Sequence, residues 1–187
     1  MGRVYSAIDE ELAEFLLAQH LFFVASAPLS PEGHVNLSPK GLNTFRILSP
    51  TRIAYLDLTG SGIETVAHMK ENGRIVLMFC ALEGSPTIVR LHGKGRVIES
   101  DSPEFASISS LFPKYEGTRC FVVIDVTRVS QSCGFAVPLL RFEGERSQLA
   151  TWATGKGEEG LQRYRETKNR TSIDGLSGLE TGPRSSG

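Results

Sequence analysis

The sequence has no apolar run that approaches the length of about 20 residues needed to cross a bilayer as a helix. It also lacks an excess of one charge, because 20 basic and 21 acidic side chains give a net charge of -1. Residues 1–15 are acidic and do not show the basic and then apolar pattern of a secretory signal. We therefore expect a cytoplasmic protein that partners neither a membrane nor nucleic acid.

Cysteine is scarce, and the three cysteines form no C-x-x-C pair, so we expect reduced thiols. The four histidines share no H-x-x-x-H or H-E-x-x-H spacing, and no metal site is predicted. A G-x-S-x-G elbow is missing, which argues against a hydrolase triad. The pairs Gly60/Gly62 and Gly93/Gly95 lack the third glycine of a dinucleotide fold. No side chain is assigned a catalytic role.

Short β-rich runs separated by proline and glycine clusters make up most of the chain. A first helix is expected from Ser6, where Ser6 and Asp9 form an S-x-x-D start. Further helices are expected between Ser61 and Gly73 and within 102–112, and a charged helix-like segment within 159–169. The expected strands are 21–27, 34–40, 44–49, 52–58, 74–82, 86–100 and 118–130. Many short strands with few helices predict a small closed or split antiparallel barrel.

Two of these strands carry further information. The run 75–82 is apolar without alternation, so we expect it to be covered on both faces, on the outside by a helix or another subunit. The long strand 86–100 has Gly93 and Gly95 near its middle, where a bulge or bend would turn a barrel corner. The expected organisation is a domain over 1–143, a polar helical extension over 144–173 and a flexible tail over 174–187.

The stretch TGSGIETVAHMKENGR (59–74) has two interpretations. Ser61 and Glu64 form a capping box, and Gly73 ends the helix. Alternatively, Gly60 and Gly62 let a ligand approach the backbone at a helix N-terminus, which makes this turn a phosphate site.

The stretch HVNLSPKG (34–41) also has two interpretations. On a strand, Asn36, Ser38 and Lys40 share one face. That face is either a polar edge in solvent, with Pro39 protecting it against aggregation, or a ligand-binding surface that converges with the turn after residue 58.

Three stretches follow one another in the order GHVNLSPKG (33–41), YLDLTGSGIETVAHMKENGRIVLMF (55–79) and IVRLHGKGRV (88–97). In this order they resemble the pyridoxamine 5′-phosphate oxidase-like FMN-binding split-barrel family over about residues 10–130. The resemblance implies a mainly β fold: a six-stranded antiparallel split β-barrel of Greek-key type with flanking helices. It further implies a homodimer with FMN at the subunit interface, and an FMN-dependent oxidoreductase that acts on an unknown small-molecule substrate or electron donor.

The resemblance also implies cofactor contacts, residue by residue. The SPKG stretch would lie near the flavin, the end of YLDLT beside the ring or ribityl chain, and the following turn around the phosphate. The implied cofactor-binding residues are Asn36, Ser38, Lys40, Leu58, Thr59, Ser61, Gly62, Glu64 and Thr65.

The chain departs from true pyridoxamine phosphate oxidases at several of these positions. They tend to have an Arg-Lys pair where this chain has Glu64 and Thr65, and an arginine where it has Ser38. Backbone amides and Lys40 would then bind most of the phosphate. Cations that would assist them are Arg74, Arg90 and Lys94, or an arginine of the partner chain.

The basic W-R-x-x-R-L ending of the true oxidases is missing, so we do not expect pyridoxamine phosphate oxidation. The alternative is a non-catalytic split-barrel protein that binds FMN, haem or a deazaflavin, because Glu64 places negative charge close to the expected phosphate. Trp152, the single tryptophan, is expected either to stack on a flavin or to anchor the core or an interface.

Overall fold

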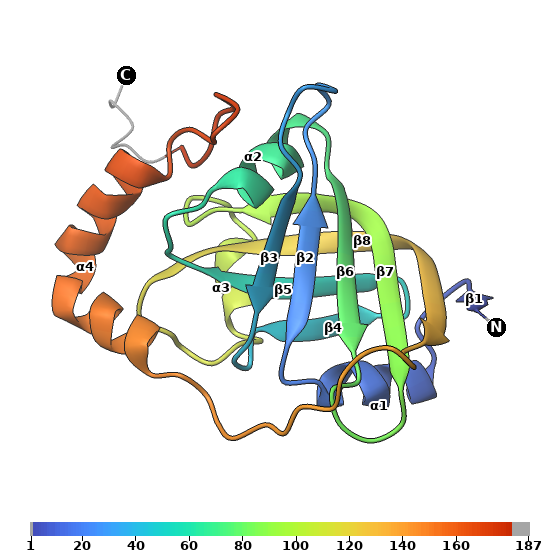
Figure 1. The fold of residues 1–187 in the computed structure, drawn as a ribbon. Coiled ribbons are helices and arrows are strands. Elements are labelled where there is room, and N and C mark those ends of the chain that lie inside the picture. Colours follow the sequence, from blue (N-terminus) through green and yellow to red (C-terminus); the bar gives the residue numbers. More distant parts are fainter. Residues whose placement is uncertain (1, 181–187) are drawn as a thin grey trace.

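An eight-stranded antiparallel sheet forms the centre of the molecule. The computed structural model describes residues 2–180, and within them the strand order is β3-β2-β6-β7-β8-β5-β4, with β1 paired to β8. In Figure 1, β3, β2, β6 and β7 lie in front while β8, β5 and β4 cross behind them, so the sheet folds over itself around a core. The strands are β1 Arg3–Tyr5, β2 Phe22–Ser26, β3 Asn36–Lys40, β4 Phe45–Ser49, β5 Arg52–Leu58, β6 Arg74–Cys80, β7 Thr87–Ile98 and β8 Thr118–Cys133.

Each run that the sequence marks as a strand forms one, which confirms a mainly β antiparallel fold with flanking helices. The sheet has eight strands in the described residues rather than six. The unexpected strand, β1, has three residues and pairs with the far end of β8, where Val4 lies opposite Ser130. So short a run has no periodicity that could mark it in the sequence.

Side chains from both layers of the folded sheet fill its interior. The Phe22 and Phe45 ring centroids are 5.7 Å apart, and those of Phe45 and Phe79 are 4.9 Å apart. Complete burial of one such aromatic side chain contributes about 1.5–3 kcal/mol. The barrel interior is therefore a packed core and leaves the ligand site to its rim.

Buried and half-buried side chains alternate along β6 more regularly than its apolar sequence indicates. Ile75 and Leu77 are buried in the core, whereas Val76 and Met78 point outward and are half-buried. The expected second cover is therefore incomplete within this chain, and the outer face of β6 stays partly open.

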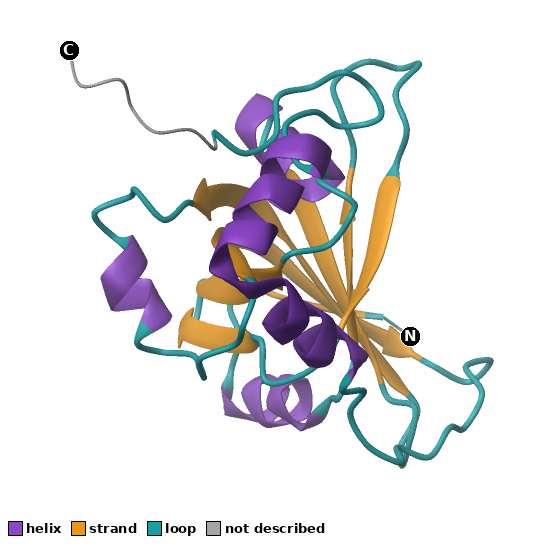
Figure 2. Cartoon of the chain, turned by 90° about the vertical axis from the view of Figure 1, so that its left-hand side faces the viewer, coloured by secondary structure: helices purple, strands orange, loops and turns teal. Residues whose placement is uncertain are grey.

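Helices cover the ends and the side of the barrel. In Figure 1, α1 (Glu10–Ala18) lies at one end, α2 (Glu64–Glu71) at the other, and α3 (Phe105–Ser109) behind the sheet. The long α4 (Gln148–Lys168) runs along the side that faces the viewer in Figure 2, and it is kinked at Gly157, which has a φ of 62°. Among the described residues, none of these helices has the length and apolar character of a membrane span.

Both α1 and α4 begin elsewhere than the sequence predicts. α1 is capped by Asp9 and not by Ser6, because the Asp9 carboxylate accepts a hydrogen bond from the Leu12 N–H at 2.9 Å. α4 begins at Gln148, well before the expected segment at 159–169. Three glycines in WATGKGEEG lower the helix propensity there and conceal this start.

The chain after α4 packs back onto the domain. Leu179 is buried against Ile63, Val66 and Cys120, and the Gly178 N–H donates to the Arg170 carbonyl at 2.7 Å. These contacts involve part of the expected tail, because residues up to 180 are described. The rest of that tail, 181–187, lies outside the described residues.

Strand β7 contains the irregularity that its glycines predict. Its register against β8 shifts between His92 and Gly93. A Cβ atom at Gly93 would meet the backbone oxygen of Asp125 and would lie 2.7 Å from Cγ2 of Ile124. The close approach of β8 therefore requires a glycine at this position.

Gly93→Ala should lower the free energy of unfolding by about 1–3 kcal/mol, the usual effect of overpacking. Gly155→Ala is the matched control, because nothing lies within 4 Å of a Cβ at that helical glycine. The free energy of unfolding of this control variant should stay unchanged or rise by up to about 1 kcal/mol. Urea denaturation measures both variants, and equal stabilities would contradict the close packing of β7 on β8.

Candidate functional site

A cavity of about 420 Å³ opens at the end of β3. Its walls come from the chain between α1 and β2, from β3, from β5 with the turn after it, and from residues 144–149 that lead into α4. Small-molecule sites typically have volumes of about 300–1,000 Å³. The walls include Lys40, Leu58, Thr59, Gly60, Glu145 and Arg146.

Asp57 is buried beneath this cavity and joins two cations. Its Oδ1 accepts a hydrogen bond from Lys40 Nζ at 2.8 Å, and its Oδ2 accepts from Arg119 Nη2 at 2.6 Å and Nε at 2.9 Å. The side chains of Asp57 and Arg119 are 2% and 5% exposed, whereas that of Lys40 is 21% exposed. Lys40 is therefore the member of the network that reaches the cavity, and Asp57 fixes its ammonium group.

The two cations determine the charge state of Asp57. Burial alone would raise the pKa of this carboxyl group, but the Arg119 guanidinium and the Lys40 ammonium outweigh it and hold the pKa well below its usual range. Burial raises the pKa of the neighbouring Tyr55 phenol and of the Cys120 thiol. At neutral pH, Asp57 is therefore ionised, while Tyr55 and Cys120 keep their protons.

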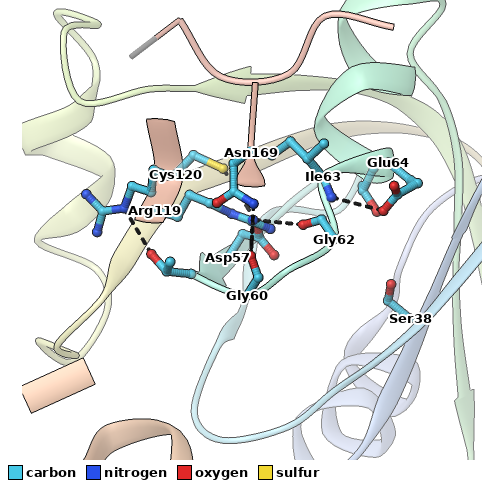
Figure 3. Close-up of polar contacts among 12 residues, drawn as sticks. Ser38, Asp57, Gly60, Gly62, Ile63, Glu64, Arg119, Cys120 and Asn169 are labelled. Atoms are coloured by element: carbon cyan, nitrogen blue, oxygen red, sulfur yellow. Dashed lines mark hydrogen bonds and ion pairs between the residues drawn. The ribbon is translucent and has the colours of Figure 1, made fainter. Parts of the chain in front are cut away.

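Arg119 also holds the turn between β5 and α2. Its Nη1 donates to the carbonyl oxygens of Gly62 at 2.8 Å and of Gly60 at 3.3 Å. Asn169, from the chain after α4, donates through Nδ2 to the same Gly60 oxygen at 2.9 Å, as Figure 3 shows. The carbonyl groups of the turn therefore face buried donors.

The start of α2 differs from the predicted capping box. The N-cap is Ile63 and not Ser61, and no side chain of the cap residue bonds to the first turn. The Glu64 carboxylate instead accepts a hydrogen bond from the Ile63 N–H at 2.9 Å (Figure 3). The capping box is wrong because the helix begins two residues later than the S-x-x-E pattern implies, which leaves Ser61 exposed on the turn.

The structure separates the predicted cofactor-binding residues into three groups. One group lines the cavity: Lys40, Leu58 and Thr59. A second group forms a hydrogen-bonded chain between β3 and α2: Asn36, Ser38 and Thr65. A third group belongs to the turn and the helix start: Ser61, Gly62 and Glu64.

Internal hydrogen bonds connect the polar face of β3 to α2. Asn36 Nδ2 donates to Thr65 Oγ1 at 2.8 Å, and Ser38 Oγ donates to Asn36 Oδ1 at 3.3 Å. This face is therefore not a free edge in solvent. Lys40 is the polar residue of β3 that lines the cavity.

Three other cations were expected to assist in binding a phosphate. In the structure, each of them bonds to a distant part of the chain. Arg74, Arg90 and Lys94 donate to the Pro28 carbonyl, the Ser132 hydroxyl and the Asn72 carbonyl, respectively. Asp57 and Arg119 did not emerge from the sequence reasoning, although each is a charged residue within an apolar strand run. A charge in such a position signals a buried pair.

Two further predictions concern Trp152 and the cysteines. Trp152 does not line the cavity; it packs edge-on against Tyr164 at a centroid distance of 5.1 Å, with Lys156 Nζ at 5.4 Å from its ring. The cysteines are free thiols. In the part of the chain that the structure describes, no group of three metal-ligating side chains occurs.

A family model described as pyridoxamine 5′-phosphate oxidase matches residues 8–133. The chain belongs to the pyridoxamine 5′-phosphate oxidase family. This match includes all the strands from β2 to β8 and both residues of the Asp57–Arg119 pair.

Known relatives agree with this assignment. The pyridoxamine 5′-phosphate oxidase family protein ustO of Aspergillus flavus is 37% identical over 206 residues, covering 98% of this chain and 80% of that protein. Among solved structures, HupZ of Group A Streptococcus has a TM-score of 0.52 at 19% identity, covering 65% of this chain and 91% of that one. A Clostridium acetobutylicum protein related to general stress protein 26 has a TM-score of 0.51 at 13% identity, covering 66% and 86%. At these identities the two structures support the fold alone.

Proteins of this family typically bind a flavin, and FMN requires donors for its phosphate. At the N-terminus of α2, the Ile63 N–H already bonds to Glu64, while Lys40 and Arg119 are paired with Asp57. These residues do not fit a phosphate at α2. The cavity wall combines apolar side chains with the fixed ammonium group of Lys40 and with the charged side chains of Glu145 and Arg146, and its volume suits the ring of a planar ligand.

Asp57→Asn should lower the free energy of unfolding at pH 7 by about 3–5 kcal/mol, because it removes the buried counter-charge of Lys40 and Arg119. The folded-state pKa of Asp57 lies below the unfolded value of about 3.9, so its contribution is complete above that pH and is lost as the pH falls toward the folded pKa. The difference between the variant and the wild type should therefore shrink below about pH 4.

Asp125→Asn is the matched control for this experiment. Asp125 pairs with Arg52 at 2.7 Å but is 58% exposed, so its loss should change stability by less than about 1 kcal/mol. Urea denaturation at neutral and acidic pH provides the comparison. A stability difference for Asp57→Asn that does not vary with pH would contradict an ionised, doubly paired carboxylate.

Proposed function

We propose that this protein is a flavin-binding oxidoreductase that acts on a small molecule. The observation that carries the proposal is the cavity at the end of β3, where the buried Asp57 carboxylate fixes the ammonium group of Lys40 on the wall. Membership of the pyridoxamine 5′-phosphate oxidase family supports a flavin as the ligand. When bound, the flavin supplies the redox chemistry, and the chain binds and orients it.

The residues of the cavity wall have separate tasks in this proposal. Lys40 donates a hydrogen bond and places positive charge beside the ring, which tunes its reduction potential. Leu58 provides apolar contact. The Thr59 hydroxyl donates to the Gly117 carbonyl at 2.8 Å and accepts from Arg165 Nε at 3.0 Å, so it holds the wall in place.

We further propose a homodimer with the flavin at its interface. The outer face of the sheet supports this, because the paired residues Leu37, Ala25 and Val76 form one apolar row across β3, β2 and β6. Leu37 is 62% exposed and the nearby Val35 is 75% exposed. Exposed apolar patches mark interaction sites, and two-fold homodimers are the commonest soluble assemblies.

Titration with riboflavin and FMN, followed by fluorescence quenching, tests the flavin function. Purified protein should take up at least one of these flavins, and Lys40→Ala should weaken binding by about 1–3 kcal/mol, the contribution of a hydrogen bond to a charged group. Lys94→Ala is the control, because Lys94 bonds to the Asn72 carbonyl outside the cavity and should not affect binding. A colourless protein that takes up neither flavin would refute the proposal.

Val76→Glu should convert the dimer to a monomer and weaken flavin binding, because a buried charge at the interface lacks a partner. Leu17→Glu makes the same kind of change at a 58% exposed position on α1 and should leave the dimer intact. Sedimentation velocity separates the two species. A monomeric wild-type protein that still binds flavin would contradict the interface site.

A second candidate is a non-catalytic split-barrel protein that binds a flavin, haem or a deazaflavin. It is favoured by the Glu64 carboxylate at the expected phosphate end. Titration with haem and a deazaflavin, followed by reduction with NADPH, separates the two candidates. Binding without reduction in the presence of NADPH supports the second.

A further inference from the structure

The N-terminus of α2 is occupied by a carboxylate of its own chain. Glu64 Oε2 accepts a hydrogen bond from the Ile63 N–H at 2.9 Å, and Oε1 accepts one from the Ile173 N–H at 3.4 Å. A Cβ atom at Gly62 would lie 2.8 Å from Oε2, so the carboxylate is folded back against the turn. A helix N-terminus attracts anions, and here the anion is supplied internally (Figure 3).

The chain after α4 holds this arrangement closed. Asn169 is fully buried and donates to the Gly60 carbonyl, while Leu179 packs against Ile63 at the helix start. Ile173, which bonds to Glu64, belongs to the same segment. The segment after α4 therefore packs beside the helix start, while Ser61 and Gly62 on the turn stay exposed.

The cations that contact the turn and its neighbours already have partners. Arg119 bonds to Asp57 and to the carbonyls of the turn, and Lys40 bonds to the same carboxylate. Arg165 donates to the Thr59 hydroxyl and to the Thr118 carbonyl at 3.1 Å. A ligand phosphate at this helix would meet the Glu64 carboxylate, and these cations would have to give up bonds within the chain to bind it.

We propose that Glu64 takes the place of a ligand phosphate, so that the protein selects a flavin without one. This inference rests on the proposed flavin function. Riboflavin has the same ring and ribityl chain as FMN but ends in a hydroxyl group, which donates a hydrogen bond to a carboxylate where a phosphate would repel it. Gly60 lies on the cavity wall, and the turn that follows it leads to Glu64 at the start of α2.

The first test uses inorganic phosphate and needs no flavin. In the wild-type protein, the amide resonance of Ile63 should not move during a phosphate titration at constant ionic strength. In Glu64→Ala the Ile63 resonance should shift, and the shift should saturate with increasing phosphate, because the amide loses its internal acceptor. Glu11→Gln, which changes a first-turn glutamate of α1, is the matched control and should behave like the wild type. Equal shifts of Ile63 in the wild type and in Glu64→Ala would overturn the proposal.

The second test compares FMN and riboflavin in the same variants. The wild type should bind riboflavin at least as tightly as FMN. Glu64→Gln, which keeps the shape of the side chain and guards against a loss of fold, should tighten FMN relative to riboflavin by about tenfold, the effect of removing one nearby like charge. Glu11→Gln should keep the wild-type ratio.

The outcomes separate this inference from the function on which it rests. Tighter binding of FMN than of riboflavin by the wild type, or an unchanged ratio in Glu64→Gln, would overturn the selection of an unphosphorylated flavin. If neither flavin binds any variant while phosphate reaches α2 only in Glu64→Ala, the flavin function is refuted, and the replacement of a ligand anion by Glu64 is supported.

Discussion

The buried carboxylate of Asp57 organises the whole site. It lies between Lys40 on β3 and Arg119 on β8, and so it connects strands from the two layers of the sheet. A carboxylate buried this deeply persists only because two cations compensate for its lost hydration. Through Arg119 the same charge also determines the shape of the turn before α2, since the guanidinium bonds to both the carboxylate and the turn carbonyls. The position of Lys40 and the position of the turn are therefore not independent.

The fold of the family and the chemistry of its ligand can be considered separately in this protein. The strands and the order of motifs are those of a pyridoxamine 5′-phosphate oxidase family protein, and the residues at the start of α2 bond to groups of their own chain. Glu64 lies at the start of α2, and its carboxylate bonds to the backbone amides of Ile63 and Ile173. Family membership therefore supports a planar redox ligand more strongly than it supports a particular tail on that ligand.

Most of the fold was predictable from the sequence, and part of the site was. Alternating and apolar runs marked every strand longer than three residues, because the barrel core requires that periodicity. Helix starts were less accurate: a single hydrogen bond to Asp9 decides against Ser6, and α2 begins from the N-cap Ile63 without a side-chain cap, so its capping pattern at Ser61 was misleading. The network around Asp57 joins residues 62 positions apart in the chain, and no local pattern states which charges will meet.

The last described segment of the chain affects the order in which the parts of this protein fold during synthesis. All eight strands of the described residues are complete at Cys133, but the turn beside the cavity is secured by Arg165 and Asn169, which follow much later. During synthesis, the sheet can close while these residues are still inside the ribosome. A nascent chain at that stage has the barrel without the contacts that hold the turn beside the cavity, so the cavity wall is completed only after the sheet.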